Sequence, residues 1–380
     1  MNAQASTTTP RVRHAIPADR GELCSLVNTS FKFDLAAELP HLFTDERICN
    51  HIIAECDGRI AGAVGLYPHA MRIGTQMFDV AGIGQVCTLP EMRGRGVMSA
   101  ILAEVTRESD MLDFTWLFGD RLRYGRYGWA PGGMRYLFET YDKYLPAPPP
   151  PNIVRPFDIS NDVPLFLRAV DLSHQAPLFA RSETDSLFGG ERGRQLCGWI
   201  LDDAFILMWT KSQTVFFGDG TARELSALLA HAAREIRSYP DDKWKLTVEC
   251  GPEPSPLMEA CIAHYHHMRV QHDAGLRVGN LRAFLTKCCA LAQPHVTHGD
   301  DSLSFVNTDN GQEATISCAK GRLSVTGRSA RDARRLNTRE LSEVLFSLCP
   351  LDALMPGVPP DSPLRHVFPL PVWINKMYSL

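Results

Sequence analysis

The stretch that decides the fold of this chain is Val86-Cys87-Thr88-Leu89-Pro90-Glu91-Met92-Arg93-Gly94-Arg95-Gly96-Val97-Met98-Ser99. A strand is predicted over residues 77–87, and the turn that contains Gly94 and Gly96 follows it. A helix is predicted directly after Gly96, because Val97, Ile101 and other apolar residues recur at helical spacing. The chain therefore passes from strand to helix through a short basic turn.

This turn has the physical properties of a phosphate site. The first N–H groups of a helix are unpaired and carry partial positive charge. Glycine lets a phosphate approach that backbone closely, and the flanking Arg93 and Arg95 add charged donors. No Gly-Lys-Ser/Thr follows, and the third glycine of a dinucleotide fingerprint is absent. The pattern favours pyrophosphate binding, and a solvated basic turn is the alternative.

The residues around this turn predict a mixed α/β layer. Strands are expected at 51–56 and 59–66, joined by the hairpin signal Asp57-Gly58. Helical spacing follows Pro17, an apolar strand is expected at 114–118, and residues 128–139 lead into another. The segment from residue 11 to 145 reads as one domain.

A proline run at residues 146–151 ends this segment, and residues 146–152 are expected to form a stiff linker. The segment 153–272 repeats the alternation of strand and helix, with a helix predicted over 222–236. It has no glycine-rich turn, so it is expected to lack the anion site.

The last segment, 273–380, is expected to contain short strands and then one helix. The strands are predicted at 303–308, 314–319 and 323–326. Asn337 and Glu340 resemble a capping box at the start of the helix.

Composition excludes several classes of protein. Lys plus Arg total 39 and Asp plus Glu 43, a net charge of −4, so bulk charge does not favour nucleic acid. No apolar run approaches the ~20 residues of a membrane span. Residues 1–10 are polar, lack the apolar stretch of a signal peptide and are expected to be disordered. The eleven cysteines include no C-x-x-C pair and are expected to be buried and reduced, in a soluble cytoplasmic protein.

Two motifs carry a resemblance to a known family. Residues 86–98 resemble motif A of the GNAT N-acetyltransferases, Q/R-x-x-G-x-G/A, with Arg93 and Gly96 matching and Met98 departing from the usual small residue. Residues 123–129 resemble the Y-G-R-F-G-Y stretch of the enhanced intracellular survival (Eis) branch. That branch has an active GNAT domain, a degenerate GNAT domain and a sterol-carrier-protein-like domain. The resemblance implies an α/β (α+β) fold with these three domains at 11–145, 153–272 and 273–380.

The resemblance implies that acetyl-CoA is the acyl donor. The strand before the turn would pair with the pantetheine arm, and the amides of residues 94–99 would hold the pyrophosphate. Gly119 and Asp120, at the end of the next strand, would make a further contact with acetyl-CoA. The implied cofactor residues are Val86, Cys87, Thr88, Arg93, Gly94, Arg95, Gly96, Val97, Met98, Ser99, Gly119 and Asp120.

The resemblance also implies two catalytic groups. Tyr124 matches the general acid that protonates the leaving thiolate; the alternative is a packing aromatic. The C-terminal carboxylate, here that of Leu380, matches the general base. The tail 368–380 is apolar and aromatic, which favours docking; the alternative is a final strand of the last domain.

Two other chemistries are weaker readings of the sequence. His264, His266 and His267, together with His272, suggest a metal, but no acidic or cysteine ligand stands at a matching interval, so no metal is expected. Cys87 suggests an acyl-cysteine intermediate, but its apolar neighbours favour a packing thiol.

The predicted function is direct transfer of acetyl to a primary amine in a ternary complex. The acceptor implied by the resemblance is an aminoglycoside- or polyamine-like cation, or lysine. The alternative is a non-catalytic module that binds CoA or an acyl lipid. Neither nucleic acid nor membrane is an expected partner, and the family's ring-like assemblies suggest a homo-oligomer that the sequence itself does not show.

Overall fold

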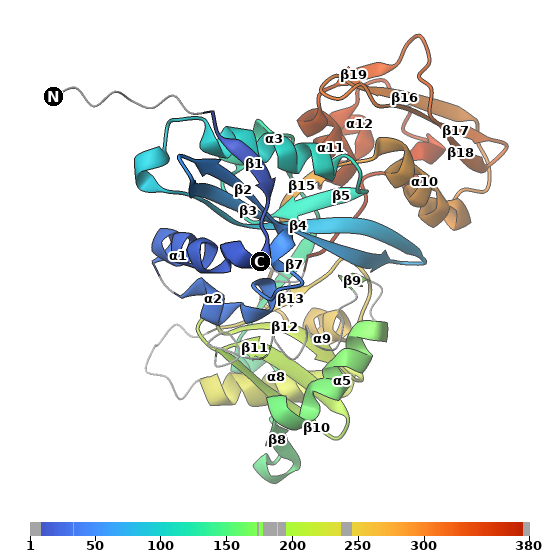
Figure 1. Cartoon of the computed structure of the whole chain (residues 1–380). Coiled ribbons are helices and arrows are strands. Elements are labelled where there is room, and N and C mark those ends of the chain that lie inside the picture. The colour runs from blue at the N-terminus through green and yellow to red at the C-terminus, as the bar shows by residue number, and fades with distance from the viewer. Residues whose placement is uncertain are drawn as a thin grey trace.

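The computed structural model describes residues 9–32, 34–172, 175–177, 188, 195–236 and 245–374. Residues 1–8 of the predicted N-terminal tail and the predicted base, Leu380, lie outside these ranges. The described chain forms three sheets (Figure 1), with the first in blue and cyan, the second mainly in green and yellow, and the third in orange. Two mixed sheets followed by a C-terminal sheet confirm the predicted fold class.

The first sheet has the order β1-β2-β3-β4-β5-β15-β6, and β9 pairs with β3. Asp57 and Gly58 join β2 to β3 with φ of 53° and 74°, which confirms the predicted hairpin turn. β4 and β5 run parallel. The strands are β1 (Arg11–His14), β2 (His51–Cys56), β3 (Arg59–Ile73), β4 (Gln76–Thr88), β5 (Phe114–Leu117), β6 (Ala130–Gly132), β9 (Gln175–Pro177) and β15 (Ala274–Val278).

Helices pack on this sheet where apolar periodicity predicted them. A 3₁₀ turn at Pro17–Asp19 leads into α1 (Arg20–Phe31), and α2 (Leu35–Glu38) follows. α3 (Val97–Ser109) buries Val97, Ile101, Leu102 and Val105 against the sheet. α4 (Arg121–Gly125) follows β5.

The second sheet repeats this plan with the order β14-β7-β13-β12-β11-β10-β8. α8 follows β12 over the residues predicted, and β12 pairs in parallel with β13. The elements are β7 (Arg135–Thr140), β8 (Val154–Pro156), β10 (Leu196–Leu201), β11 (Ala204–Trp209), β12 (Thr214–Asp219), β13 (Leu246–Cys250), β14 (His267–Gln271), α5 (Ile159–Leu172), α8 (Ala222–Ile236) and α9 (Pro256–His264).

Two strands cross the domain boundaries predicted from the sequence. β7 precedes the proline linker but pairs with β13 and β14 in the second sheet. β15 follows the second segment but pairs with β5 and β6 in the first sheet. The sheets therefore do not coincide with the segments 11–145, 153–272 and 273–380, because strand pairing depends on partners that are distant in sequence.

The third sheet has the order β18-β17-β16-β19, and its strands are β16 (Asp301–Asn307), β17 (Glu313–Ala319), β18 (Arg322–Thr326) and β19 (Arg334–Leu336). Asn337 and Glu340 form the predicted capping box of α11 (Thr338–Phe346). The expectation of one helix in this segment was wrong. α10 (Leu281–Ala292) precedes the strands, with Asn280 as its N-cap, and α12 (Leu351–Leu354) follows α11.

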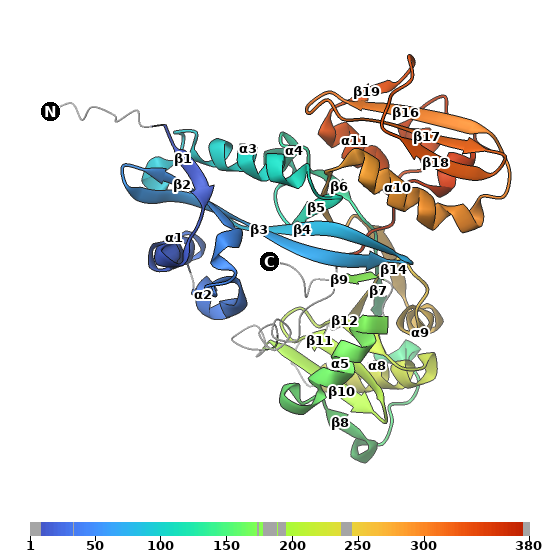
Figure 2. The same ribbon diagram turned by 45° about the vertical axis from the view of Figure 1, so that its right-hand side comes forward.

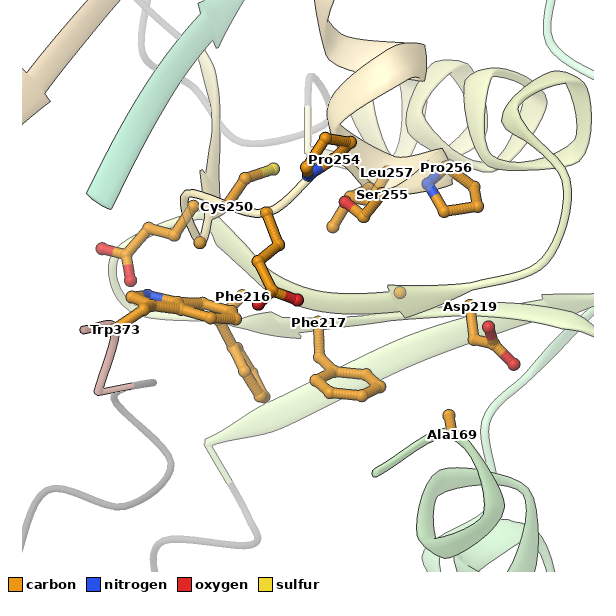
Figure 3. A pocket seen from close by; sticks show the side chains of 14 residues that line it. Ala169, Phe216, Phe217, Asp219, Cys250, Pro254, Ser255, Pro256, Leu257 and Trp373 are labelled. Atoms are coloured by element: carbon orange, nitrogen blue, oxygen red, sulfur yellow. The ribbon is translucent and has the colours of Figure 1, made fainter. Parts of the chain in front are cut away.

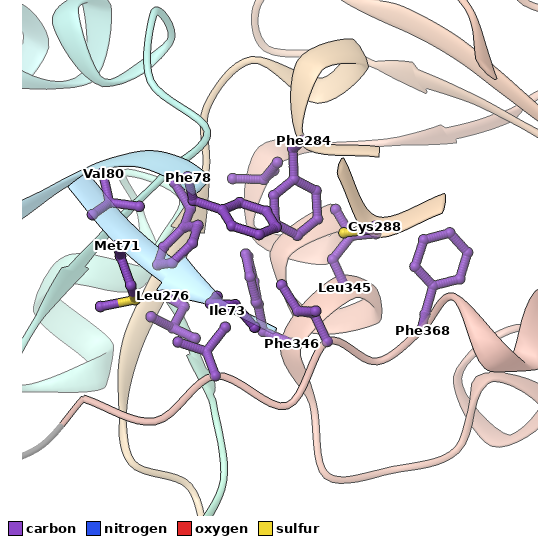
Figure 4. Close-up of a cluster of buried hydrophobic side chains, with 14 of the residues drawn as sticks. Met71, Ile73, Phe78, Val80, Leu276, Phe284, Cys288, Leu345, Phe346 and Phe368 are labelled. Atoms are coloured by element: carbon purple, nitrogen blue, oxygen red, sulfur yellow. The ribbon is translucent and has the colours of Figure 1, made fainter. Parts of the chain in front are cut away.

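One apolar cluster joins the third domain to the first sheet. Phe284 of α10 lies 6.0 Å from Phe78 of β4 and 5.1 Å from Phe346 of α11, measured between ring centroids (Figure 4). Lys287, one turn along α10, donates to Asp113 at 2.5 Å. Figure 2 shows α10 beside the end of the β3–β4 hairpin, so the C-terminal domain is attached through its first helix.

The cysteines are unpaired throughout. All eleven are free, and most are buried as predicted, although Cys49 and Cys349 are exposed. Among the described residues, no helix is both long enough and apolar enough to cross a bilayer.

Replacing Phe284 with Ala removes the ring that joins β4, α10 and α11. The cavity and lost burial are expected to lower the free energy of unfolding by about 3–5 kcal/mol, measured by urea denaturation. Thr286→Ala on the exposed side of α10 is the control and is expected to change it by less than about 0.5 kcal/mol. Equal effects of the two substitutions would contradict this packing.

Candidate active site

The turn between β4 and α3 has the geometry that an anion site requires. Gly94 and Gly96 have φ of 74° and 78°, a left-handed conformation that favours glycine. A Cβ built at either position meets no atom within 4 Å, so the space above the turn is open. No side chain caps the start of α3, although Gly96 occupies the N-cap position. Its first N–H groups therefore remain available to an anion.

The strand edge beside this turn is open as well. β4 pairs with β5 from Val80 to Ile83, and within the described residues Gly84–Thr88 pair only with β3. The two parallel strands separate from that point on. The predicted pantetheine residues, Val86, Cys87 and Thr88, lie on this separated part of β4. Its N–H and C=O groups on the β5 side can pair with an amide chain.

A β-bulge interrupts β4 within this open edge. Ala63 pairs with Cys87 and Gly65 pairs with Gly84, so one residue of β3 opposes two of β4. Gln85, one of the two, has φ of 47°. A bulge re-aims the backbone groups beside it, and this one lies on the part of β4 that has no partner on the β5 side.

A buried polar network holds this bulge, and sequence reasoning missed it. The Tyr67 hydroxyl donates to Oε1 of Gln85 and lies 2.8 Å from Nε2 of His51. Burial lowers the pKa of His51 to about 4, so its imidazole is neutral at physiological pH. The sequence signal that could have revealed this network is one polar side chain in each of three apolar strands: His51 in β2, Tyr67 in β3 and Gln85 in β4.

Cys87 belongs to the core rather than to the chemistry. Its side chain packs in the cluster beneath β3 and α1, and burial raises the pKa of the thiol to about 11. Thiolate is the nucleophilic form of cysteine. The structure therefore agrees with a packing role for this side chain.

Gly119 and Asp120 shape the start of α4. A Cβ on Gly119 would lie 2.6 Å from Cε2 of Tyr124, so only glycine fits against that ring. Asp120 caps α4, since its Oδ1 accepts hydrogen bonds from the N–H groups of Leu122 and Arg123 at 2.7 and 3.1 Å. Asp120 therefore orients the turn of helix that carries Tyr124.

Tyr124 lines a cavity of about 280 Å³ at the end of β5. Its ring packs edge-on against Trp129, with centroids 6.5 Å apart. Burial raises the pKa of the phenol above its ordinary value. Nε1 of Trp129 is buried and has no hydrogen-bond partner among the described residues, which leaves a donor beside the cavity. The predicted acid thus faces a cavity and also packs as an aromatic.

The far wall of this cavity comes from the boundary between the second and third predicted segments, to which the sequence analysis gave no role in this site. His272 and Asp273, directly before β15, line it together with Ala274 and Gly275. Asp273 is buried and accepts a hydrogen bond from the N–H of Ile374. The C-terminal segment therefore passes the Tyr124 cavity at Ile374.

Further contacts hold this segment in place. The carbonyl of Val372 accepts a hydrogen bond from the N–H of Met134 at 2.7 Å, between β6 and β7. Ile374 is buried in the cluster that joins the domains. The tail is docked as expected up to Ile374, and the predicted base Leu380 lies beyond the described residues.

The histidine cluster is engaged in packing. Nδ1 of His264 lies 2.9 Å from the carbonyl oxygen of Tyr144, and His266 stacks on the Tyr144 ring. Within the described part of the chain, no three His, Cys, Asp or Glu side chains are placed to hold a metal ion.

Comparison with protein families assigns the domain that contains this site. Residues 11–132 match the acetyltransferase (GNAT) domain. The first domain is a GNAT acetyltransferase domain. The predicted enzyme class, an N-acetyltransferase, is thereby confirmed. No curated protein matches the chain in sequence.

Solved structures share the architecture of the whole chain. A probable N-acyltransferase from Enterococcus faecalis has 15% identity and a TM-score of 0.70, covering 91% of this chain and 92% of that one. A GCN5-related N-acetyltransferase from Kribbella flavida has 17% identity and a TM-score of 0.67, with 90% of each chain covered. Eis1 from Mycobacterium abscessus has 12% identity and a TM-score of 0.63, covering 97% and 99%. At such low identities the likeness establishes the fold, including the Eis-like order of domains.

Because burial raises the pKa of Tyr124, its phenol is expected to keep its proton to higher pH than the phenol of an exposed tyrosine. We expect a ¹³Cζ-tyrosine NMR titration, with the resonance assigned by Tyr124→Phe, to give a midpoint above that of an exposed tyrosine. A midpoint no higher than that of an exposed tyrosine would contradict the buried environment.

Proposed function

We propose that this protein transfers the acetyl group of acetyl-CoA to a primary amine of a cationic acceptor, in a ternary complex within its first domain. The observation that carries the proposal is the uncapped two-glycine turn of α3, next to the open edge of β4 and the Tyr124 cavity. The turn suits a phosphate, the open strand edge suits an amide chain, and the cavity suits an acyl group, in the order in which these groups follow one another in acetyl-CoA.

The chain's own residues fit each part of this co-substrate. The amides from Gly94 to Ser99 would hold the pyrophosphate, with Arg93 and Arg95 adding charge. The open edge at Val86–Thr88 would pair with the pantetheine amides. When bound, acetyl-CoA supplies an activated thioester. Val97 and Met98 supply backbone N–H groups, and Gly119 and Asp120 shape the turn at the end of β5.

Two proton transfers are needed for the reaction. The acceptor must lose its ammonium proton before its nitrogen attacks the thioester carbonyl, and the departing sulfur must gain one. Tyr124, held protonated by burial, would donate the second proton. The nitrogen forms the amide bond as the carbon–sulfur bond breaks, and free CoA leaves as the thiol.

We assign the first proton transfer to the C-terminal carboxylate of Leu380. Ile374 is anchored at Asp273 on the wall of the Tyr124 cavity. A chain extends at most about 3.3–3.6 Å per residue, so the segment after Ile374 can span about 20 Å. This reach is sufficient for the carboxylate of Leu380 to enter the Tyr124 cavity, which Asp273 lines.

A carboxylate at that place also favours a cationic acceptor. We therefore propose an aminoglycoside- or polyamine-like amine, or lysine, as substrate. The free cysteines suit the reducing cytoplasm. The C-terminal domain would be sterol-carrier-protein-like, and self-association into a homo-oligomer would follow the family named above.

The function is tested by measuring thiol release from acetyl-CoA against a panel of polyamines, aminoglycosides and lysine peptides. At least one amine is expected to release CoA, with the N-acetylated product identified by mass spectrometry. Tyr124→Phe is expected to lower kcat by ~10²- to 10⁴-fold while CoA affinity holds. CoA binding without release by any amine would instead favour a CoA- or acyl-lipid-binding module.

Gly96→Glu should abolish acetyl-CoA binding in titration calorimetry, because it places a negative side chain where the phosphates must lie. Gly96→Ala is the matched control. Its Cβ meets no atom, so only the left-handed φ is penalised and the loss of affinity should be much smaller. Unchanged affinity in Gly96→Glu would refute this placement of the pyrophosphate.

Adding three residues after Leu380 should reduce turnover strongly, because the carboxylate is displaced while the anchor at Asp273 stays. Acetyl-CoA affinity and melting temperature should remain near those of the natural chain. An equal extension at the N-terminus is the control. An extended protein that acetylates its amine at the normal rate would exclude the terminal carboxylate as base.

A further inference from the structure

The second domain contains a cavity of its own, of about 340 Å³. It lies at the ends of the parallel strands β12 and β13 and at the start of α9. Figure 3 shows Phe216 and Phe217 on its wall, between Trp373 at one end and Asp219 at the other. None of its lining residues lines the Tyr124 cavity, so the two are separate sites.

Its position repeats that of the first site. In each sheet a strand leads into a long helix and pairs in parallel with the next strand of the layer: β4 with α3 and β5, and β12 with α8 and β13. Crevices at the carboxyl ends of such parallel strands are common ligand sites. The second domain has therefore retained the crevice of a GNAT-like layer.

The anion site beside that crevice is closed. At the start of α8, Oε2 of Glu224 accepts hydrogen bonds from the N–H and the hydroxyl of Thr221, at 2.9 and 2.6 Å. A carboxylate thus occupies the end of the helix that a phosphate would need. A Cβ on Gly220 would meet Cβ of Ala204 at 2.4 Å, so this glycine fits tight packing rather than an open turn. This local chemistry excludes a second CoA phosphate.

The cavity instead carries negative charge. Asp219, Glu249 and Glu253 line it, and none of the described residues that line it is Lys, Arg or His. Arg135 donates to Glu249 at 3.3 Å and so balances one of the three. Asp219 and Glu253 have no hydrogen-bond or ion-pair partner among the described residues. Two half-buried carboxylates therefore face the cavity, and within the part of the chain that the structure describes no cation pairs with either of them.

Three aromatic residues also line the cavity. Phe216 is fully buried, Phe217 and Trp373 are half-buried, and the face of an aromatic ring attracts cations. Trp373 is held in place, because a Cβ on the adjacent Gly251 would lie 2.5 Å from its Cε3. Apolar faces with a few converging carboxylates suit an ammonium group carried on an alkyl chain.

We infer that the second domain binds an organic cation, an alkylammonium or polyamine, in the cavity between β12, β13 and Trp373. Asp219 and Glu253 pair with its ammonium groups, and the half-buried rings of Phe217 and Trp373 pack against its alkyl part. The second domain therefore lacks the phosphate site of the first domain and instead has a cavity that suits a cation. The inference does not depend on the acyl transfer proposed above.

Spermidine is the probe, and the protein is labelled with 5-fluorotryptophan and studied without CoA. The ¹⁹F resonances of Trp373 and Trp129 are assigned by Trp373→Phe and Trp129→Phe, and they report on the second cavity and on the Tyr124 cavity. Spermidine is expected to shift the Trp373 resonance in a saturable way. Asp219→Asn combined with Glu253→Gln is expected to weaken that binding at least about tenfold, as charge-assisted contacts are lost.

Asp203→Asn combined with Glu259→Gln is the control, because both residues are exposed in the same domain and neither lines the cavity. It should bind spermidine as the natural chain does. Glu253→Lys, which places a cation in the cavity, should abolish the shift of the Trp373 resonance. The Trp129 resonance should behave in this variant as it does in the natural chain. Three results would overturn the inference: no saturable shift at Trp373, an equal shift with 1,8-octanediol, or an unchanged affinity in the Asp219→Asn/Glu253→Gln protein.

Discussion

The separation of β4 from β5 after Ile83 is the constraint on which the rest of the first domain depends. A strand inside a sheet normally has both edges paired, and buried backbone groups without partners are costly. The parallel pair ends at Leu117, and Gly84–Thr88 continue toward α3 without a partner on that side. The bulge at Gln85 and the open turn at Gly94–Gly96 lie along the same path, so the open strand edge and the open turn follow one departure from regular pairing.

The buried network of Tyr67, His51 and Gln85 stabilises this departure. A bulge is tolerated where its polar groups are satisfied, and here the Tyr67 hydroxyl on the adjacent strand β3 donates to the Gln85 side chain and lies against the neutral imidazole of His51. These residues hold the backbone of β4 in the shape that the open edge requires.

Exchange of strands ties the two mixed sheets together and brings the tail to the site. Because β7 belongs to the second sheet and β15 to the first, the segment before β15 crosses between them. Asp273 lies on that crossing, where it lines the Tyr124 cavity and anchors Ile374. The same arrangement places Trp373 on the wall of the second cavity, while the next residue, Ile374, donates to Asp273 on the wall of the Tyr124 cavity.

The sequence by itself determined the local structure of this protein. Glycines at 94 and 96 after a strand, the periodicity of Val97 to Val105, the Asp57-Gly58 turn and the Asn337 capping box all depend on neighbours in the chain, and all are as predicted. Only the tertiary structure decided that β7 and β15 change sheets, that Tyr67 and His51 support Gln85, and that Asp273 meets the C-terminal segment. These contacts join residues far apart in sequence, and their energies come from burial and pairing in space, which leave no periodic signal in the chain.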